Sequence, residues 1–233
     1  MATFRIALFR THILSNILKV GLFFLTLSQY PVIGPLLKAM GRVFFKVVMY
    51  VQTVSTTTGD HNHKIVTLTT ADEIIKKQKE IYLCECACRT LRKSCDHPIF
   101  TCMVFGKVSN GKKITQHEAL EIIKSCEDKN LVHNAIFVLN VPVAMCNCCK
   151  CACLAILADK YGFDCIEGTG YVATIDEQRC NHCGICVYSC QFEAISDTFF
   201  VDKNTCKGCG LCLTKCPNKA ISFVKNDLFI SVS

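Results

Sequence analysis

The first 59 residues of the chain contain no aspartate and no glutamate, and Asp60 is the first carboxylate. The segment carries only sparse positive charges, at Arg5, Arg10, Lys19, Lys38, Arg42 and Lys46. It also lacks the small-residue cleavage site that ends a secretory signal peptide. An apolar segment with scattered basic residues and no acids is typical of helices that lie in the interface plane of a membrane.

The N-terminal segment is also too interrupted for a straight spanning helix. Val20 to Leu37 is uncharged over 18 residues, close to the roughly 20 that a spanning helix needs. Pro31 and Pro35 fall at its far end, and proline clashes with the preceding turn. We therefore predict a helical hairpin whose residues 4–50 bind the membrane surface through an apolar side and a basic stripe. A spanning hairpin and docking on a partner subunit are the alternatives.

Catalytic signatures are missing as well. No three cysteines have the C-x3-C-x2-C spacing typical of radical-SAM enzymes, and no Ser/His/Asp set or phosphate-binding loop is present. The run Gly168 to Ala173 has the letters G-x-G-x-x-A, but a strand is predicted after it, where a dinucleotide site requires a helix. An enzymatic function therefore has little support in the sequence.

Cysteine, by contrast, is abundant, with 20 among 233 residues. In a short secreted chain this would indicate a disulfide scaffold, but this chain is long enough to bury a hydrophobic core. The spacings described below favour metal binding, so we place the protein in a reducing compartment, on the cytoplasmic side of the membrane. The formal charge of +7 counts no thiolates, and metal-bound cysteines are deprotonated. It therefore predicts no nucleic-acid partner.

The C-terminal region carries a duplicated cysteine motif. The spacing C-x2-C-x2-C-x3-C occurs twice, 26 residues apart. Three thiolates at this spacing wrap around one [4Fe-4S] cluster, and the fourth starts a helix that carries it to the other cluster. Zinc prefers paired C-x2-C knuckles with a longer spacer. The predicted ligands are Cys180, Cys183, Cys186 and Cys216 for the first cluster, and Cys206, Cys209, Cys212 and Cys190 for the second.

Residues 171–225 resemble the bacterial-type ferredoxins with two [4Fe-4S] clusters. The run YVATIDEQRC, from Tyr171 to Cys180, looks like the strand that leads into the first motif. The resemblance implies a pseudo-twofold ferredoxin fold and low-potential one-electron transfer. It covers about a quarter of the chain. One departure concerns a helix start and no ligand: Gln191 stands where the second motif has Pro217.

Ten further cysteines form two sets at the ends of the middle region. The runs CACR and CNCCKC, together with Cys95, Pro98 and Cys102, resemble a cysteine-rich module found beside ferredoxin domains in proteins of anaerobes. Thiolate-only sites favour iron–sulfur clusters or zinc, and we expect at least one additional [4Fe-4S] cluster, with zinc as the alternative. The candidate ligands are Cys86, Cys88, Cys95, Cys102, Cys146, Cys148, Cys149 and Cys151.

Three details refine this expectation. Cys148 and Cys149 are adjacent and point apart in an extended chain, so they serve two centres or one of them is a spectator. Arg89, next to Cys88, would offset the negative charge of a thiolate-bound cluster. Cys126 lies inside a predicted helix, as a small core residue does. The spacings do not show which four thiols form a set.

The predicted fold class is α+β, in three parts. Residues 1–58 form the helical hairpin and a polar linker, residues 59–170 a mixed α/β cysteine-rich domain, and residues 171–233 a ferredoxin-like two-cluster domain. The linker extends into the middle domain as far as Lys64, with solvated histidines at positions 61 and 63.

Within the middle domain, two capping boxes predict helices. Thr70 with Glu73 predicts a helix ending near Glu80, and Thr115 with Glu118 predicts one ending near Lys129. A strand is predicted over residues 135–141 and a further helix over residues 151–161.

The sequence favours an iron–sulfur electron-transfer protein, a subunit of a membrane-associated anaerobic oxidoreductase complex that passes single electrons to redox partner proteins or subunits. Two alternatives remain open: an oxidoreductase with a catalytic cluster in the middle domain, and a redox-sensing regulator. Against the regulator, the helix from Thr115 to Lys129 exposes few basic side chains for DNA, and sensing does not require two ferredoxin clusters.

Overall fold

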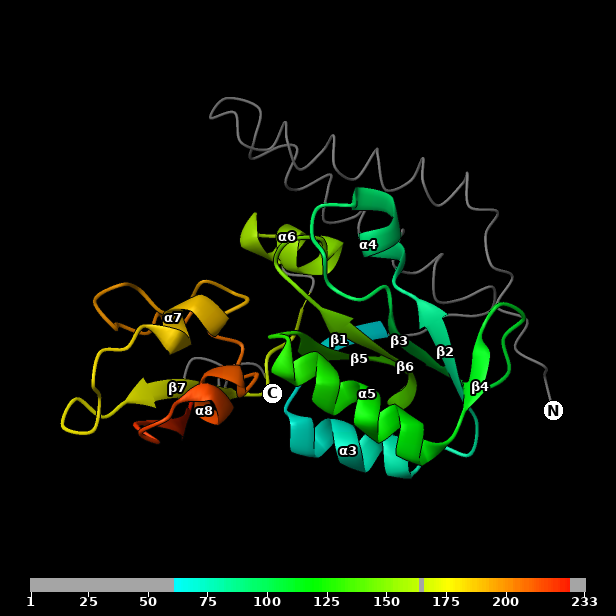
Figure 1. Ribbon diagram of the computed structural model, residues 1–233, viewed down its shortest axis with the longest axis horizontal. Coiled ribbons are helices and arrows are strands. Elements are labelled where there is room, and N and C mark those ends of the chain that lie inside the picture. The colour runs from blue at the N-terminus through cyan, green and yellow to red at the C-terminus, as the bar shows by residue number, and fades with distance from the viewer. Residues whose placement is uncertain (1–60, 164–165, 227–233) are drawn as a thin grey trace.

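The computed structural model describes residues 61–163 and 166–226 (Figure 1). The predicted hairpin at residues 4–50, most of the polar linker, and Cys165 lie outside the described residues. None of the helices in the described part of the chain is long and apolar enough to cross a membrane.

A six-stranded antiparallel sheet forms the centre of the middle region. Its strand order is β1-β5-β6-β3-β2-β4. The strands are β1 (His61–Val66), β2 (Ile81–Glu85), β3 (Phe100–Phe105), β4 (Lys112–Ile114), β5 (Val132–Val138) and β6 (Val141–Cys148). The sequence thus forms a mixed α/β structure built on one large antiparallel sheet.

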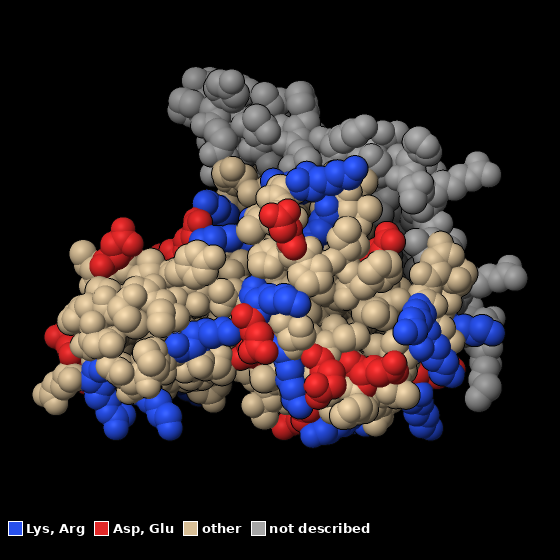
Figure 2. Space-filling model, viewed as in Figure 1, with Lys and Arg blue, Asp and Glu red and all other residues tan. Residues whose placement is uncertain are grey.

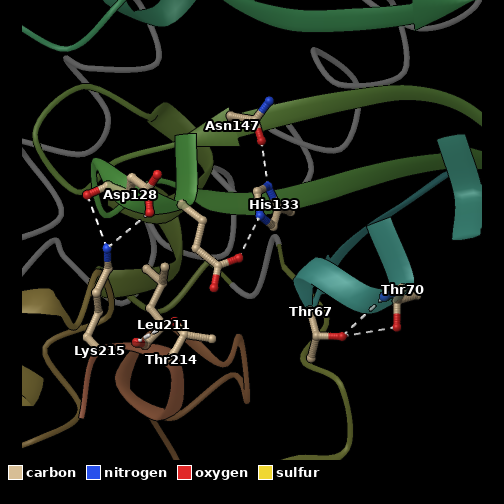
Figure 3. Close-up of polar contacts among 9 residues, drawn as sticks. Thr67, Thr70, Asp128, His133, Asn147, Leu211, Thr214 and Lys215 are labelled. Atoms are coloured by element: carbon tan, nitrogen blue, oxygen red, sulfur yellow. Dashed lines mark hydrogen bonds and ion pairs between the residues drawn. The ribbon is translucent and has the colours of Figure 1, made fainter. Parts of the chain in front are cut away.

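Two helices, α3 (Leu68–Lys76) and α5 (Gln116–Asp128), cover one face of this sheet (Figure 1). Their apolar sides, including Ile75 and Ile123, pack with Met103 and Met145 of the sheet in a closed core. The capping box of Thr115 and Glu118 is confirmed at the start of α5. The one at Thr70 is wrong: α3 begins earlier, because Thr67 caps it and Leu68 also packs on the core (Figure 3).

Two short helices, α4 (Ala87–Arg92) and α6 (Leu154–Lys160), lie over the opposite face (Figure 1). Successive residues of a strand point to opposite faces of a sheet. Since Met103 and Met145 face α3 and α5, their neighbours Cys102 and Cys146 face the side of α4 and α6. A second apolar cluster on that side joins Ile65 and Val132 of the sheet to Ile156 of α6.

Three element boundaries differ from the predictions. Residues His61 to Lys64 belong to β1 and not to the linker, and the half-buried His63 pairs its Nδ1 with Asn134 Nδ2 at 3.1 Å. The strand predicted over residues 135–141 starts three residues earlier and ends before a turn at Leu139 and Asn140, which both have positive φ. The last helix of the region starts at residue 154, because residues 149–153 form the cysteine loop.

The C-terminal region consists of a two-stranded antiparallel sheet and two short helices. Its elements are β7 (Tyr171–Ile175), α7 (Ile185–Ser189), α8 (Leu211–Lys215) and β8 (Ile221–Lys225). The predicted strand at Tyr171 is confirmed. The buried Lys207 ties this region to the middle one, since its ammonium group contacts Asp159 Oδ1 at 3.0 Å and the Ile166 carbonyl at 3.3 Å.

Candidate metal centres

The first C-terminal motif surrounds an apolar hollow. Cys180, Cys183, Cys186 and Cys216 all line it. Three of these come from the first motif and one from the second. The other walls are largely apolar, with Ile175 and Phe199 among them, and four thiols converging on one apolar hollow are the ligand set of an iron–sulfur cluster. The residues present therefore fit a [4Fe-4S] cluster.

The second motif forms an equivalent group around Cys190. The thiols of Cys206, Cys209 and Cys212 all lie within electrostatic range of Cys190. Burial raises the pKa of Cys209 to about 12, so without a metal this thiol stays protonated. Binding to iron is what holds such a buried group as a thiolate.

The short helices lie differently from the prediction. The fourth cysteine of each motif does not start a helix: Cys190 and Cys216 end α7 and α8 in an extended conformation. Each helix instead follows a left-handed glycine, Gly184 or Gly210. A helix of one turn between the third and fourth thiols carries the fourth one away from its own loop. Gln191 therefore follows a helix end and does not affect a helix start.

Backbone amides point at the motif thiols in matching ways. Ala194 N donates to Cys190 Sγ at 3.3 Å, and Ala220 N donates to Cys216 Sγ at 3.3 Å. His182 N donates to Cys180 Sγ at 3.4 Å. Amide donors to cysteine sulfur stabilise the thiolate and influence cluster potential. The two motifs are thus equivalent in bonding as well as in spacing.

Comparison with protein families identifies this region. The family model described as the 4Fe-4S binding domain matches twice, at residues 173–196 and 199–222. The C-terminal region is therefore a ferredoxin-type 4Fe-4S binding domain with two repeats, and it has the capacity for iron–sulfur electron transfer. No curated protein and no solved structure gave a match to the chain.

The middle region brings most of its predicted ligands together on one sheet face. Cys84 and Cys102 are direct partners in the pairing of β2 with β3. A chain of sulfur contacts then links neighbouring thiols, from Cys146 through Cys102, Cys86, Cys88 and Cys153 to Cys148. We call these six residues and Cys84 the sheet-face thiols. Hydrogen bonds from Cys102 and Cys88 lower the pKa of Cys86, as expected for a thiolate held by neighbouring donors.

Three other predicted ligands form a separate group. Cys95, from the loop between α4 and β3, meets Cys149 and Cys151, from the loop between β6 and α6. Their sulfur atoms all lie within 4.8 Å of one another, with 3.8 Å between Cys95 and Cys149. We call these three the loop thiols. The adjacent Cys148 and Cys149 thus belong to different groups.

Arg89 lies between the two groups with only 3% of its surface exposed. Its guanidinium donates to Thr101 Oγ1 at 2.7 Å and to the carbonyls of Pro98 and Asn147. The side chain also interacts with Cys86 on one side and Cys149 on the other. A buried cation at this point offsets thiolate charge in both groups.

The two regions touch at the cysteine loops. Gln191 is buried, and its Oε1 accepts the backbone amide of Lys150 at 2.8 Å. Cys209 and Leu211 pack in the same apolar cluster as Cys148 and Cys153. The second ferredoxin motif therefore adjoins the sheet-face thiols.

Sequence reasoning missed two members of the sheet-face group, Cys84 and Cys153. The even spacing of positions 84, 86 and 88 was a signal for the first. Cys153 had no such signal, because only the turn after β6 brings it back beside Cys148. Cys126, predicted as a core residue, is buried in an apolar cluster with Leu131, and burial raises its pKa to about 12.

A buried polar chain was also missed. His133 Nδ1 contacts Asn147 Oδ1 at 2.6 Å, and His133 Nε2 contacts Glu127 Oε2 at 3.3 Å (Figure 3). Asn147 Nδ2 donates to the Thr101 carbonyl at 2.6 Å, so the Asn147 oxygen faces His133. This polar chain runs from Glu127 of α5 through His133 of β5 to Asn147 of β6, the strand that carries Cys146 and Cys148.

Proposed function

We propose that this protein is an electron-transfer subunit of a membrane-associated anaerobic oxidoreductase complex. Its C-terminal domain holds two [4Fe-4S] clusters with crossed fourth ligands, and the sheet-face thiols hold one more. Each such cluster accepts and releases one electron at a time. The single observation that carries the proposal is the contact between the second ferredoxin motif and the sheet-face thiols.

That contact gives the relay a direction in space. The ligands proposed for the second cluster include Cys209, which packs against the apolar cluster that contains Cys148 and Cys153. The first cluster's ligands lie at the far end of the domain, where Cys183 is exposed. The side chains of Tyr188 and Phe200 are 77% and 69% exposed near that end. A redox partner would therefore meet the protein at the first motif, and the middle region would receive the electron from the second.

Polar contacts join the two regions. Lys207 and Gln191 join the ferredoxin loops to the middle region through buried polar contacts. Lys215 adds a contact to Asp128 at the end of α5, at 3.1 Å to its carbonyl (Figure 3). On the face seen in Figure 2, basic and acidic side chains are interspersed, with no broad field of one sign. Fixed distances between centres suit a relay.

Rapid reduction of the full-length protein by a low-potential donor tests the relay. The wild type should show three reducible [4Fe-4S] signals by electron paramagnetic resonance. In the Cys216→Ser variant the first site is impaired, and reduction of the middle cluster by a ferredoxin-sized donor protein should slow at least tenfold. A small viologen, which reaches every centre directly, serves as the control donor. Equal slowing with both donors would contradict the relay.

The membrane role is a separate part of the proposal, carried by the acid-free N-terminus. Anionic headgroups would attract the stripe of Lys38, Arg42 and Lys46 while the apolar sides enter the acyl boundary. Full-length protein should float with anionic vesicles and be partly released by high salt. Replacing the three basic residues by glutamine should reduce flotation while leaving the clusters intact. Protein that ignores vesicles but co-purifies with a tight partner would identify the segment as a docking element.

A further inference from the structure

The loop thiols differ from every other cysteine group in how closely they approach one another. Among the described residues, no other three cysteine, histidine or carboxylate ligand atoms lie within 4.8 Å of one another. The eight ferredoxin cysteines all lie in the described part of the chain, and neither of their quartets reaches that spacing. The same structure therefore contains two kinds of thiol site, one with widely separated sulfur atoms and one with closely spaced sulfur atoms.

The two spacings match two kinds of metal centre. In a [4Fe-4S] cluster each thiolate binds its own iron at a separate corner, so the sulfurs lie well apart. On one tetrahedral zinc ion, with Zn–S bonds of about 2.3 Å, two thiolates lie about 3.8 Å apart. The sulfurs of Cys95 and Cys149 are 3.8 Å apart. The loop thiols thus have the spacing of ligands that share a single ion.

From this we infer that Cys95, Cys149 and Cys151 bind one zinc ion, at a site distinct from all the iron–sulfur centres. Thiolate ligands favour soft metals, and zinc binds more tightly than ferrous iron to the same ligands. Each thiol releases its proton to solvent when the ion binds. Three protein ligands leave the fourth tetrahedral position to water, as in zinc sites that exchange ligands.

The surroundings hold the three ligands in place and balance their charge. Ser94 Oγ donates to the Cys151 carbonyl at 2.7 Å and joins the two loops directly. Gln191 fixes the loop between Cys149 and Cys151 through the Lys150 amide. A zinc ion with three thiolates carries one net negative charge, and the guanidinium of Arg89 interacts with Cys149. The site is therefore preformed, and Arg89 offsets part of its charge.

Metal analysis of full-length protein, purified without oxygen and with zinc in the growth medium, tests the inference independently of the electron relay. We expect about one zinc ion per chain. Cys149→Ser and Cys95→Ser should lose the zinc and keep their iron and their electron paramagnetic resonance signals. Cys126→Ser, which changes a buried cysteine in the same apolar cluster, should keep both metals. Zinc X-ray absorption should show three sulfur neighbours and one lighter atom.

Two results would overturn the zinc site. One is wild-type protein that contains no zinc. The other is a Cys149→Ser variant that retains its zinc or loses iron with its resonance signal, which would make Cys149 a cluster ligand. Cys95 lies in a half-buried loop, so its substitution leaves the core intact. The iron that the Cys95→Ser variant retains shows that the variant is correctly folded.

Discussion

The ferredoxin region and the middle region gather their cysteines by different means. In the ferredoxin region, each loop presents three thiols at positions i, i+3 and i+6, and only the fourth comes from the other repeat. In the middle region, the thiols come from three strands, two helix starts and two loops. The first arrangement is nearly local in sequence, and the second depends on the register of a six-stranded sheet. Two sites built from the same thiol ligands can therefore depend on tertiary structure to very different degrees.

The largest expected effect tests the one non-local feature of the ferredoxin region. Cys190→Ser should remove or strongly weaken the second cluster, because Cys190 lies with Cys206, Cys209 and Cys212, and leave the first intact. Site-resolved Mössbauer or paramagnetic NMR spectra of the two clusters measure this. Ser189→Ala, at the neighbouring position, is the control and should keep both. A spectrum in which Cys190 ligates the iron of its own motif would show that the clusters are not crossed.

The second prediction tests the middle region. Cys86→Ser should remove one cluster, or about four iron atoms and four sulfides per chain, since Cys86 interacts with both Cys102 and Cys88. Cys126→Ser should leave iron unchanged, because Cys126 lies in α5 as a buried member of an apolar cluster. Iron and acid-labile sulfide analysis of the two variants tests this prediction. Unchanged iron in the Cys86 variant would mean that the sheet-face thiols hold no cluster.

A third prediction concerns the close approach of the second cysteine loop to the start of β7. Gly208 has φ +65°, and a Cβ there would lie 2.1 Å from Thr169 Oγ1 and 2.3 Å from the Tyr171 carbonyl oxygen. Gly208→Ala should cost about 3 kcal/mol, from left-handed backbone strain and overpacking together. Gly106→Ala, at φ +110° with nothing within 4 Å, should cost only the strain. The test is to compare the thermal unfolding midpoints of the two variants, both purified without oxygen. Equal midpoints would argue against the close approach at Gly208.

The smallest expected effect is a pH dependence of the protein's stability, which arises from the buried pair of Glu127 and His133. Burial opposes ionisation of Glu127 and is the largest single influence, but the hydrogen bonds from His133 and Thr214 and the charge of Lys215 together outweigh it and lower the pKa of Glu127. A carboxyl group with a lowered folded-state pKa stabilises the fold above its ordinary pKa near 4.5, and the contribution is lost as pH falls through the folded value. The free energies of unfolding of Glu127→Gln and of the wild type should therefore differ most near neutral pH and become equal in acid. Paired unfolding curves at each pH test this, and a constant difference would contradict it.

Only part of the middle region was predictable from its residues. The capping box at Thr115 identified α5 because the pattern is local and complete. The earlier box failed because Thr67 and Thr70 both suit an N-cap, and only packing of Leu68 on the sheet decides between them. The structure places Cys146 and Cys148 two positions apart on β6 and so on one face, and their spacing says nothing about which strand lies opposite.

The sequence by itself determined the ferredoxin motifs, because their ligands are set by short spacings within single loops and by a repeat of 26 residues. It also showed that adjacent Cys148 and Cys149 point apart. Only the tertiary structure decided that one joins the sheet-face thiols and the other the loop thiols, and that Arg89 lies between them. The physical reason is that these groups form where β2, β3 and β6 pair and where two distant loops meet, and strand order and loop packing depend on the whole core.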